Sequence, residues 1–172
     1  LIGTVLTFCM QSSAALMAIT MVLCSSGVLP IYMGIALVLG ENIGTTITSN
    51  IAAMGANTQA RRAALAHLTF NVFGVIWVLC IFYPFIDMVC GFVGVNPHAD
   101  HIDATRLSVV LAAFHTTFNV CNTTVLIWFI PQMERFVCYV IKPSMKKDED
   151  DFRLRYIGGT AIMKTPELSV LE

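Results

Sequence analysis

Two long apolar stretches dominate the second half of the chain, at residues 63–83 and 107–130. As helices, both are long enough to cross a bilayer core of about 30 Å, which takes about 20 apolar residues. Residues 84–106 between them carry glycine, proline and aspartate, a composition typical of an exposed loop with room for one short helical piece. The pattern therefore predicts two antiparallel membrane spans joined by that loop.

Residues 1–60 show a different pattern, in which short apolar pieces alternate with polar, uncharged clusters. The apolar pieces cover residues 1–10, 14–24 and 28–39, and the interruptions cover residues 11–13, 25–27 and 40–50. Such short pieces suit half-helices and re-entrant hairpins better than complete spans. Irregular backbone at membrane depth is tolerated only where protein buries it or where it lines a watery cavity. The interruptions are therefore predicted to be walls of a binding site.

Composition narrows the class of protein. Hydrophobic residues make up 56% of the 172 residues and charged residues 12%, whereas soluble domains are about a quarter charged. Residues 1–60 hold one acid, Glu41, and no base, which indicates a membrane-embedded segment. A net charge of −1 without a basic face argues against nucleic-acid binding. The six cysteines form no C-x-x-C pair, so neither a disulfide scaffold nor a resident metal site is predicted.

The basic residues predict which ends face the cytoplasm. Arg61 and Arg62 flank the start of the first long span, most other bases follow the second, and only Arg106 lies between the spans. By the positive-inside bias, residues 60–62 and the C-terminal tail are expected in the cytoplasm. The loop between the spans is expected to face outward.

Gln11, Ser12 and Ser13 place one amide and two hydroxyls between apolar pieces, with no charge to partner them. Such groups are costly in hydrocarbon unless they are hydrogen-bonded or bind a ligand. One interpretation is that they bond to carbonyl groups of neighbouring helices. The other is that their oxygens coordinate a small cation, while the N-terminus of a half-helix offers its N–H groups to an anion.

Residues 40–50 form a second and denser polar cluster. Gly40 and Gly44 have the G-x-x-x-G spacing of helix packing, but packing does not call for so many hydroxyl and amide groups. The excess favours a site. The residues predicted to line one cavity with residues 11–13 are Asn42, Thr45 and Thr46, with Thr48 in support. Glu41 is predicted near water at the end of the break, because its charge would repel an anion; direct cation binding is the alternative.

A short sequence recurs within the two long stretches. Residues 67–72 (His-Leu-Thr-Phe-Asn-Val) and 115–120 (His-Thr-Thr-Phe-Asn-Val) match at five of six positions, which indicates a related helix used twice. In each copy the histidine and the asparagine lie four residues apart and share a helix face. Hydrogen bonding between helices is favoured for these groups, and support of a site by Asn71 and Asn119 is the functional hypothesis. Direct proton or metal chemistry is the third alternative.

Four motifs, taken in order, resemble those of the type II sodium/phosphate cotransporter family. They are residues 11–13 (Gln-Ser-Ser), 40–46 (Gly-Glu-Asn-Ile-Gly-Thr-Thr), 61–64 (Arg-Arg-Ala-Ala) and 67–71 (His-Leu-Thr-Phe-Asn), within a similarity over residues 3–141. The resemblance implies two inverted halves, each with a Q-S-S-S motif that lines a shared sodium and phosphate site. This chain resembles the second half, so that role falls on Gln11, Ser12 and Ser13. Ala14 stands where the family has its third serine, and any ligand supplied there is absent or replaced.

The tail resembles that of bacterial members of the family. A segment like residues 157–160 and 165–168 leads there into a cytoplasmic PhoU-like domain, and the resemblance implies that this chain stops before that domain. The chain is therefore expected to be a fragment, with a transmembrane transport domain over residues 1–141 and a cytoplasmic linker over residues 142–172. Its transport domain would hold the second repeat and the following helix, and the N-terminal repeat would be missing.

The sequence thus predicts an all-α polytopic membrane protein with broken or re-entrant helical hairpins, one half of an inverted-repeat transporter of the inner or plasma membrane. Its expected function is sodium-coupled transport of inorganic phosphate by alternating access, without covalent chemistry and without a cofactor beyond Na⁺ as coupling ion. The expected partners are phosphate, sodium, the lipid bilayer and the missing repeat, and a homo-oligomer is left open.

Two alternatives compete with this interpretation. A membrane-embedded enzyme using His67, His115 and Glu41 would act without a sodium gradient. It is disfavoured because the polar residues are mainly neutral and no nucleophile and base have a recognisable spacing. A non-transporting helical subunit would need no water-accessible cavity.

Overall fold

The computed structural model describes residues 1–99 and 102–143, and these residues contain helices and no strand. The helices are α1 (Ile2–Met10), α2 (Ser13–Ser25), α3 (Ile31–Ala53), α4 (Thr58–Cys80), α5 (Phe82–Val93), α6 (Ala104–Leu126) and α7 (Ile130–Val140), with a 3₁₀ turn at Ile127–Phe129. Three of them are long and apolar enough to cross a bilayer: α3, α4 and the continuous stretch Ala104–Val140. The prediction of an all-α polytopic membrane protein is confirmed. The predicted linker beyond residue 143 lies outside the described residues.

The two predicted spans correspond to α4 and α6, but the segment between them is more ordered than the sequence suggested. Helix α5 occupies the first part of the predicted loop and buries Phe85, Ile86, Val89 and Cys90. These residues recur at helical spacing, so they form one apolar stripe that packs into the core. The helix ends at Gly94, whose φ of 73° is left-handed. The short helical piece that the sequence allowed for is therefore present, but one of its faces packs into the core instead of lying exposed.

The largest correction concerns α3. The polar cluster at residues 40–50 was predicted to break the helix, yet α3 continues through it to Ala53. The hydroxyls bond to the helix's own carbonyls: Thr45 Oγ1 donates to the Glu41 oxygen at 3.0 Å, and Ser49 Oγ donates to the Thr45 oxygen at 3.0 Å. These hydroxyl groups are satisfied within the helix, so they do not interrupt it.

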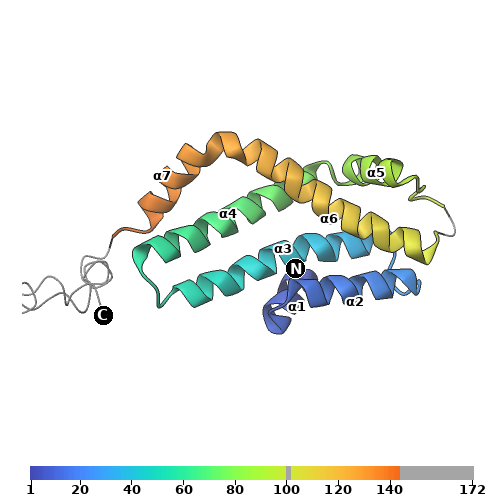
Figure 1. Ribbon diagram of the computed structural model, residues 1–172, viewed down its shortest axis with the longest axis horizontal. Helices are drawn as coiled ribbons and strands as arrows, with labels where there is room; N and C mark the ends of the chain where they lie inside the picture. Colours follow the sequence, from blue (N-terminus) through green and yellow to red (C-terminus); the bar gives the residue numbers. More distant parts are fainter. Residues whose placement is uncertain (100–101, 144–172) are drawn as a thin grey trace, which may run out of the picture.

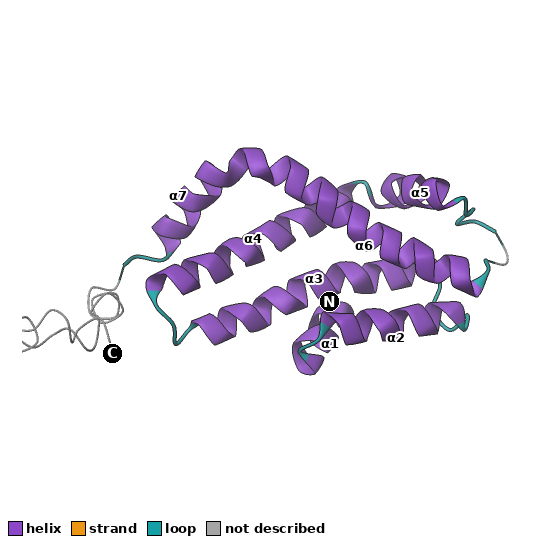
Figure 2. Cartoon of the chain, in the orientation of Figure 1, coloured by secondary structure: helices purple, strands orange, loops and turns teal. Residues whose placement is uncertain are grey.

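Helix α3 lies between the α1–α2 hairpin and the pair formed by α4 and α6, as Figures 1 and 2 show. Along α3, Gly3 lies near Leu37, and Thr7 lies near Gly44, so α1 runs in the same direction as α3. Helix α2 then returns antiparallel to both. The hairpin therefore turns beside the later half of α3.

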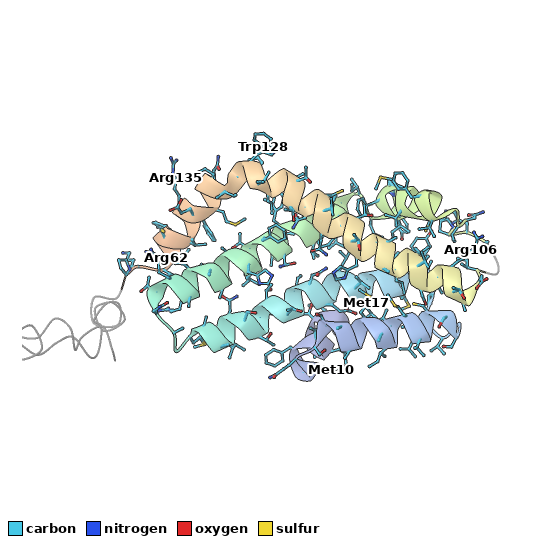
Figure 3. The ribbon with its side chains drawn as sticks, viewed as in Figure 1. Met10, Met17, Arg62, Arg106, Trp128 and Arg135 are labelled. Atoms are coloured by element: carbon cyan, nitrogen blue, oxygen red, sulfur yellow. The ribbon has the colours of Figure 1, made fainter. Side chains whose placement is uncertain are left out.

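The start of α4 and the end of α7 lie at the same end of the molecule. Arg62 donates from Nε and Nη2 to the Ile141 carbonyl oxygen, at 3.0 and 2.9 Å. Arg106 lies at the opposite end (Figure 3). The two spans are therefore antiparallel, as predicted.

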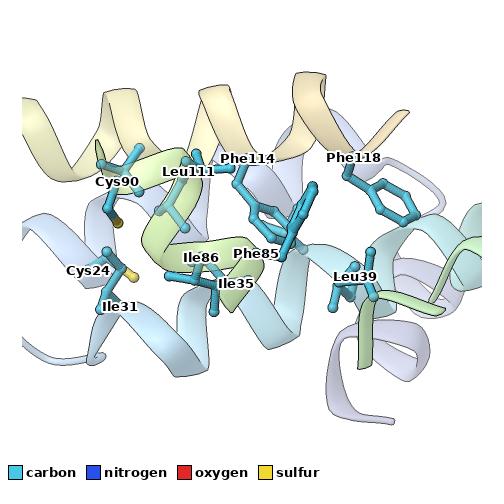
Figure 4. Packing of buried hydrophobic residues seen from close by; sticks show 14 of the residues in the cluster. Cys24, Ile31, Ile35, Leu39, Phe85, Ile86, Cys90, Leu111, Phe114 and Phe118 are labelled. Atoms are coloured by element: carbon cyan, nitrogen blue, oxygen red, sulfur yellow. The ribbon is translucent and has the colours of Figure 1, made fainter. Parts of the chain in front are cut away.

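The core sits where α2, α3, α5 and α6 meet. Figure 4 shows Ile35 and Leu39 of α3 facing Phe85, Phe114 and Phe118. The Phe85 and Phe114 rings pack edge to face with centroids 5.5 Å apart. Large side chains such as Trp128 and Tyr139 point outward and are 79% and 81% exposed. A membrane protein can carry apolar side chains both in its core and on its surface, because lipid covers the surface ones.

Candidate functional site

Two of the three predicted breaks in residues 1–60 separate helices: residues 25–27 lie at the turn from α2 into α3, where Gly27 has a left-handed φ of 76°, and residues 11–13 lie at the shorter junction of α1 and α2. Gln11 has a left-handed φ of 54°, and its N–H donates to the Thr7 oxygen at 2.8 Å. Ser12 then caps α2, because its Oγ accepts from the Ala15 N–H at 3.2 Å. The first turn of α2 also leaves N–H groups without helical partners. The turn therefore presents an amide, two hydroxyls and a half-helix N-terminus together.

Small residues hold this turn against α3. A Cβ added at Gly40 would lie 2.9 Å from the Thr4 nitrogen, and one at Gly44 would lie 2.6 Å from Thr7 Cβ. Thr4 Oγ1 also donates to the Gly40 carbonyl oxygen at 3.1 Å. The packing interpretation of the G-x-x-x-G spacing is therefore confirmed for these two glycines. Gln11 follows Thr7 by one helical turn, so the contact between Thr7 and Gly44 determines where Gln11 lies along α3.

The predicted site residues of α3 lie on two faces of the helix. Thr45 follows Glu41 by four residues and so shares its face, which packs against α2 through Thr20. Thr46 is buried and shares a face with Asn50, whose Nδ2 donates to the Ala64 oxygen of α4 at 2.8 Å. The first face borders the α1–α2 hairpin, and the second borders α4.

The remaining predicted residues bond locally. Asn42 Nδ2 donates to the Val38 oxygen at 3.4 Å, and Thr48 Oγ1 donates to the Thr45 oxygen at 2.8 Å. Within residues 1–99 and 102–143, no hydrogen bond links residues 11–13 to Asn42, Thr45 or Thr46. The turn therefore lies beside α3, but no hydrogen bond joins residues 11–13 to these three side chains in the described part of the chain.

Glu41 is not where the sequence placed it. It lies in the middle of α3 with no exposed surface, rather than near water at the end of a break. Its Oε1 accepts from Thr20 Oγ1 at 3.3 Å, and its Oε2 is buried without a hydrogen-bond partner. The position follows from the unbroken helix, because α2 covers this face of α3 halfway along its length.

The repeated motif gives the same local bond in both copies. Asn71 Nδ2 donates to the His67 oxygen at 3.1 Å, and Asn119 Nδ2 donates to the His115 oxygen at 2.8 Å. Both bonds stay within their own helix. The favoured prediction of hydrogen bonds between helices is therefore wrong for these asparagines.

The bond between the helices is made instead by Asn122, which the sequence interpretation missed. Asn122 is fully buried, donates from Nδ2 to the Phe70 oxygen at 3.0 Å and accepts from Trp77 Nε1 at 3.1 Å. A Cβ at Gly74 would lie 2.6 Å from Asn122 Nδ2, so this glycine permits the close approach. The sequence does contain a signal for this residue, because Asn122 is an amide within an apolar span, one helical turn after the repeated motif.

Two cavities lie near the ends of the long helices. One of 310 Å³ is lined by Ile47, Asn50, Ile51, Ala53, Met54, Arg61, Leu65, Leu68, Val140 and Ile141. Another of 510 Å³ lies between α2 and the start of α6, and residues 11–13 line neither. Among the described residues, no three His, Cys, Asp or Glu side chains gather in a way that could hold a metal ion. The His67, His115 and Glu41 set of the enzyme alternative is thus not assembled as a metal centre.

Comparisons with known proteins point to one family. The profile of a family described as Na+/Pi-cotransporter matches residues 1–93. The uncharacterized protein YqeW of Bacillus subtilis is 41% identical over 93 residues, which are 54% of this chain and 29% of that protein. The putative inorganic phosphate export protein YjbB of Escherichia coli K12 is 26% identical over 170 residues, 99% of this chain and 29% of its own length.

A human relative extends the comparison. Sodium-dependent phosphate transport protein 2B of Homo sapiens is 36% identical over 88 residues, 49% of this chain and 12% of that protein. The chain spans less than a third of the length of each of these relatives. No solved structure gives a significant match.

Proposed function

Because the chain belongs to the Na+/Pi-cotransporter family, we propose that it forms part of a membrane transporter, not an enzyme, which moves inorganic phosphate with sodium as the coupling ion. The names of the relatives from Escherichia coli and Homo sapiens support phosphate as the substrate, and the human name supports sodium dependence. The observation that carries the proposal is the α1–α2 turn, which presents neutral polar groups and a half-helix N-terminus beside α3. No cofactor beyond the transported sodium is proposed.

The two ligands need different groups. Phosphate accepts hydrogen bonds, so it is assigned to donors: the Gln11 amide, the Ser12 and Ser13 hydroxyls and the first-turn N–H groups of α2. Sodium needs oxygen lone pairs. The hydroxyls of Thr45 and Thr46 donate to carbonyls of their own helix, at 3.0 and 2.7 Å, which leaves their lone pairs free for a cation. Asn42 adds an amide oxygen as a sodium ligand. Thr48, Asn71 and Asn119 are proposed to support the site without binding phosphate or sodium themselves.

The hairpin is proposed to be re-entrant. Helix α2 ends in a turn on both sides and has 13 residues, so it is about 20 Å long, short of a bilayer core of about 30 Å. The turn between α1 and α2 is therefore proposed to lie at membrane depth, where irregular backbone needs cover or a watery cavity. The inverted N-terminal repeat is proposed to supply that cover, and rocking of the two halves would expose the site alternately to each side.

Sidedness is proposed from the bases. Residues 1–141 would form the transport domain of the inner or plasma membrane, with Arg61, Arg62 and the linker over residues 142–172 in the cytoplasm.

We expect Lys142→Cys and Asn96→Cys to be labelled from opposite sides of the membrane, because both positions are exposed and lie at opposite ends of the α4–α6 pair. The measurement uses a membrane-impermeant thiol reagent on intact cells and on inverted vesicles. The background is the full-length transporter with its exposed cysteines replaced, including Cys9 and Cys80. Labelling of both positions from one side would contradict the proposed topology.

The function is tested by uptake of radiolabelled phosphate into proteoliposomes that hold the full-length transporter, with and without a sodium gradient. We expect uptake only with the gradient, and Ser12→Ala and Thr45→Val should each weaken it. A lost hydrogen bond or oxygen ligand to a charged species is worth about 1.5–3 kcal/mol, roughly ten- to a hundredfold in affinity. Ser12→Ala should raise the phosphate KM, and Thr45→Val should raise the sodium requirement.

Two matched variants separate binding from structure. Ser12→Asp keeps a side-chain oxygen that can cap α2 but has no hydrogen to donate and repels an anion, so it should bind phosphate at least as poorly as Ser12→Ala. Thr124→Val removes the same type of bond to a carbonyl four residues earlier, on an exposed part of α6, and should transport like wild type. If Ser12→Ala and Thr45→Val also transport like wild type, these polar groups have only a packing role.

A further inference from the structure

The cavity of 310 Å³ has no part in the proposed binding of phosphate and sodium. It lies at the end of the molecule that is proposed to face the cytoplasm, where α3 ends, α4 begins and α7 ends (Figure 1). Arg61, Leu65 and Leu68 line it from α4, residues between 47 and 54 line it from the end of α3, and Val140 lines it from α7. Its volume is at the lower end of the range for ligand pockets, about 300–1,000 Å³. The cavity can therefore hold part of an elongated ligand.

The charged side chain of this cavity lies at its rim, and the apolar side chains lie deeper. Arg61 is in the first turn of α4, and Leu65 and Leu68 follow on the same helix face, about 6 and 10 Å further along the axis. On α3, Asn50 Nδ2 donates to an α4 carbonyl oxygen at 2.8 Å, level with the turn between Arg61 and Leu65, and Ile47 lies one turn deeper. Because α4 is long and apolar enough to span a bilayer, its start lies near the headgroups and its next turns lie in the hydrocarbon. The charged rim therefore meets the membrane surface, and the apolar wall meets the acyl chains.

The positive charge at the rim is not balanced by the protein. Arg61 is exposed, and within residues 1–99 and 102–143 its guanidinium group forms no ion pair and no hydrogen bond. Arg62 is the next residue, and Lys142 is exposed just beyond α7. The acids that the three lining helices carry are Glu41, buried midway along α3, and Glu134, exposed almost two turns before the end of α7. No acid lines the cavity among the described residues, so its rim attracts an anion.

An anionic phospholipid matches both parts of the cavity. Arginine binds phosphate through paired N–H groups, and basic pockets between membrane helices bind anionic headgroups on the cytoplasmic side. Free inorganic phosphate at Arg61 would leave the apolar wall formed by Leu65 and Leu68 uncovered. A helix of a partner protein does not fit, because one helical turn, about 10 Å wide and about 5.4 Å high, takes up more than the volume of the cavity. A phosphate group with an acyl chain below it therefore fits the site best.

We propose that this cavity binds an anionic phospholipid of the cytoplasmic leaflet, with the headgroup phosphate on Arg61 and one acyl chain against Leu65, Leu68 and Ile47. The two bonds from Arg62 to the Ile141 oxygen already join α4 to the end of α7 here. The lipid adds a contact with the end of α3, so it holds the ends of three helices together. The site rests on the proposed sidedness of the chain and does not require transport.

The headgroup contact is tested by native mass spectrometry of the purified full-length protein in detergent, titrated with phosphatidylglycerol or with phosphatidylcholine of the same acyl chains. Wild type should bind phosphatidylglycerol more tightly. Arg61→Gln, which changes an exposed side chain, should weaken that binding by about tenfold or more and remove the preference. Arg135→Gln removes an exposed base of α7 that does not line the cavity, so it should weaken binding less than about twofold. Equal losses in the two variants would show diffuse attraction to surface charge and would overturn the proposal.

The acyl-chain contact is tested by filling the cavity. Leu65→Trp should weaken phosphatidylglycerol binding by about fivefold or more, because the larger ring takes the place of the chain. Leu79→Trp makes the same change on an exposed face near the other end of α4 and should bind the lipid like wild type. Normal binding by Leu65→Trp would place the lipid elsewhere. Inorganic phosphate at the same concentration as the lipid should not displace it, and displacement would show a site for free phosphate instead.

The position of the lipid in a membrane is tested by photo-crosslinking in proteoliposomes that contain phosphatidylglycerol with a diazirine in its acyl chain. Peptides covering residues 47–54 and 61–68 should be labelled in wild type and in Arg135→Gln, and labelled less in Arg61→Gln. Absence of label from both peptides in wild type would mean that another part of the full-length protein covers the cavity, and the proposal would be overturned. These readouts do not need phosphate movement. A protein that binds the lipid here but takes up no phosphate therefore retains this site and loses the proposed function.

Discussion

Replacing Gly44 by valine is expected to lower phosphate uptake by the full-length transporter about a hundredfold, because α1 can no longer lie against α3. A Cβ at this position would lie 2.6 Å from Thr7 Cβ and 2.7 Å from the Thr4 carbonyl oxygen. One of these contacts is backbone, so the whole of α1 must shift rather than one side chain. That shift carries Gln11 and Ser12 with it. Overpacking of this kind typically also costs about 1–3 kcal/mol of stability.

The measurement compares uptake in proteoliposomes with thermal unfolding in detergent. Gly91→Val is the matched control, since Gly91 also lies in a helix but has open space around the position of a Cβ. We expect the control to insert, unfold and transport like wild type. Normal uptake by Gly44→Val would mean that α1 does not rest on α3 in the working transporter.

Replacing Asn122 by leucine is expected to lower the free energy of unfolding by about 2–4 kcal/mol, because two buried hydrogen bonds are lost at once. The change leaves the Trp77 indole N–H without its acceptor and removes the donor to the Phe70 oxygen. Each unsatisfied buried group costs about 1–3 kcal/mol, although the lower end applies in membranes, where alternative partners are found. Thermal unfolding of the full-length protein, followed by tryptophan fluorescence, measures the loss.

Two comparisons decide whether the loss comes from the bond between the helices. Asn119→Leu removes an amide that bonds within its own helix, so we expect a cost of less than about 1 kcal/mol. A double-mutant cycle of Asn122→Leu with Trp77→Phe should show coupling, because each single change removes one side of the same hydrogen bond. Additive effects in the cycle would show that Asn122 acts through packing alone.

The long spans and the α1–α2 break were predictable because their signals are local. Residues 63–83 and 107–130 are apolar over the length of a span, and they form α4 and α6 with shifts of a few residues at the ends. Gln11, Ser12 and Ser13 interrupt apolar sequence with residues that favour turns and helix caps, and the chain turns there. The length of an apolar segment is a property of one continuous stretch, and the preference for a helix cap is a property of a few neighbouring residues. Neither depends on tertiary contacts.

The course of α3 was not predictable in the same way. Its threonines, serine and asparagines are compatible both with a break and with a helix in which they bond back to carbonyls. Packing decides between the two, because α1 covers Gly40 and Gly44 and thereby removes the water that an exposed glycine backbone would otherwise bind. Because α1 packs on Gly40 and Gly44, the segment that the sequence indicated as a binding site also serves as a helix-packing motif.

By itself, the sequence determined the class of this protein: an all-helical membrane chain, the antiparallel pair of spans, the turn at residues 11–13 and the family whose motifs it carries. Only the tertiary structure decided how the polar groups are used, with Thr45 and Thr46 on different faces of α3, Asn122 rather than Asn71 or Asn119 joining the helices, and Glu41 sealed beneath Thr20. The physical reason is the range of the forces involved. Hydrophobic length and turn preference are properties of consecutive residues, whereas burial and the choice of a hydrogen-bond partner depend on which distant helix packs against a side chain.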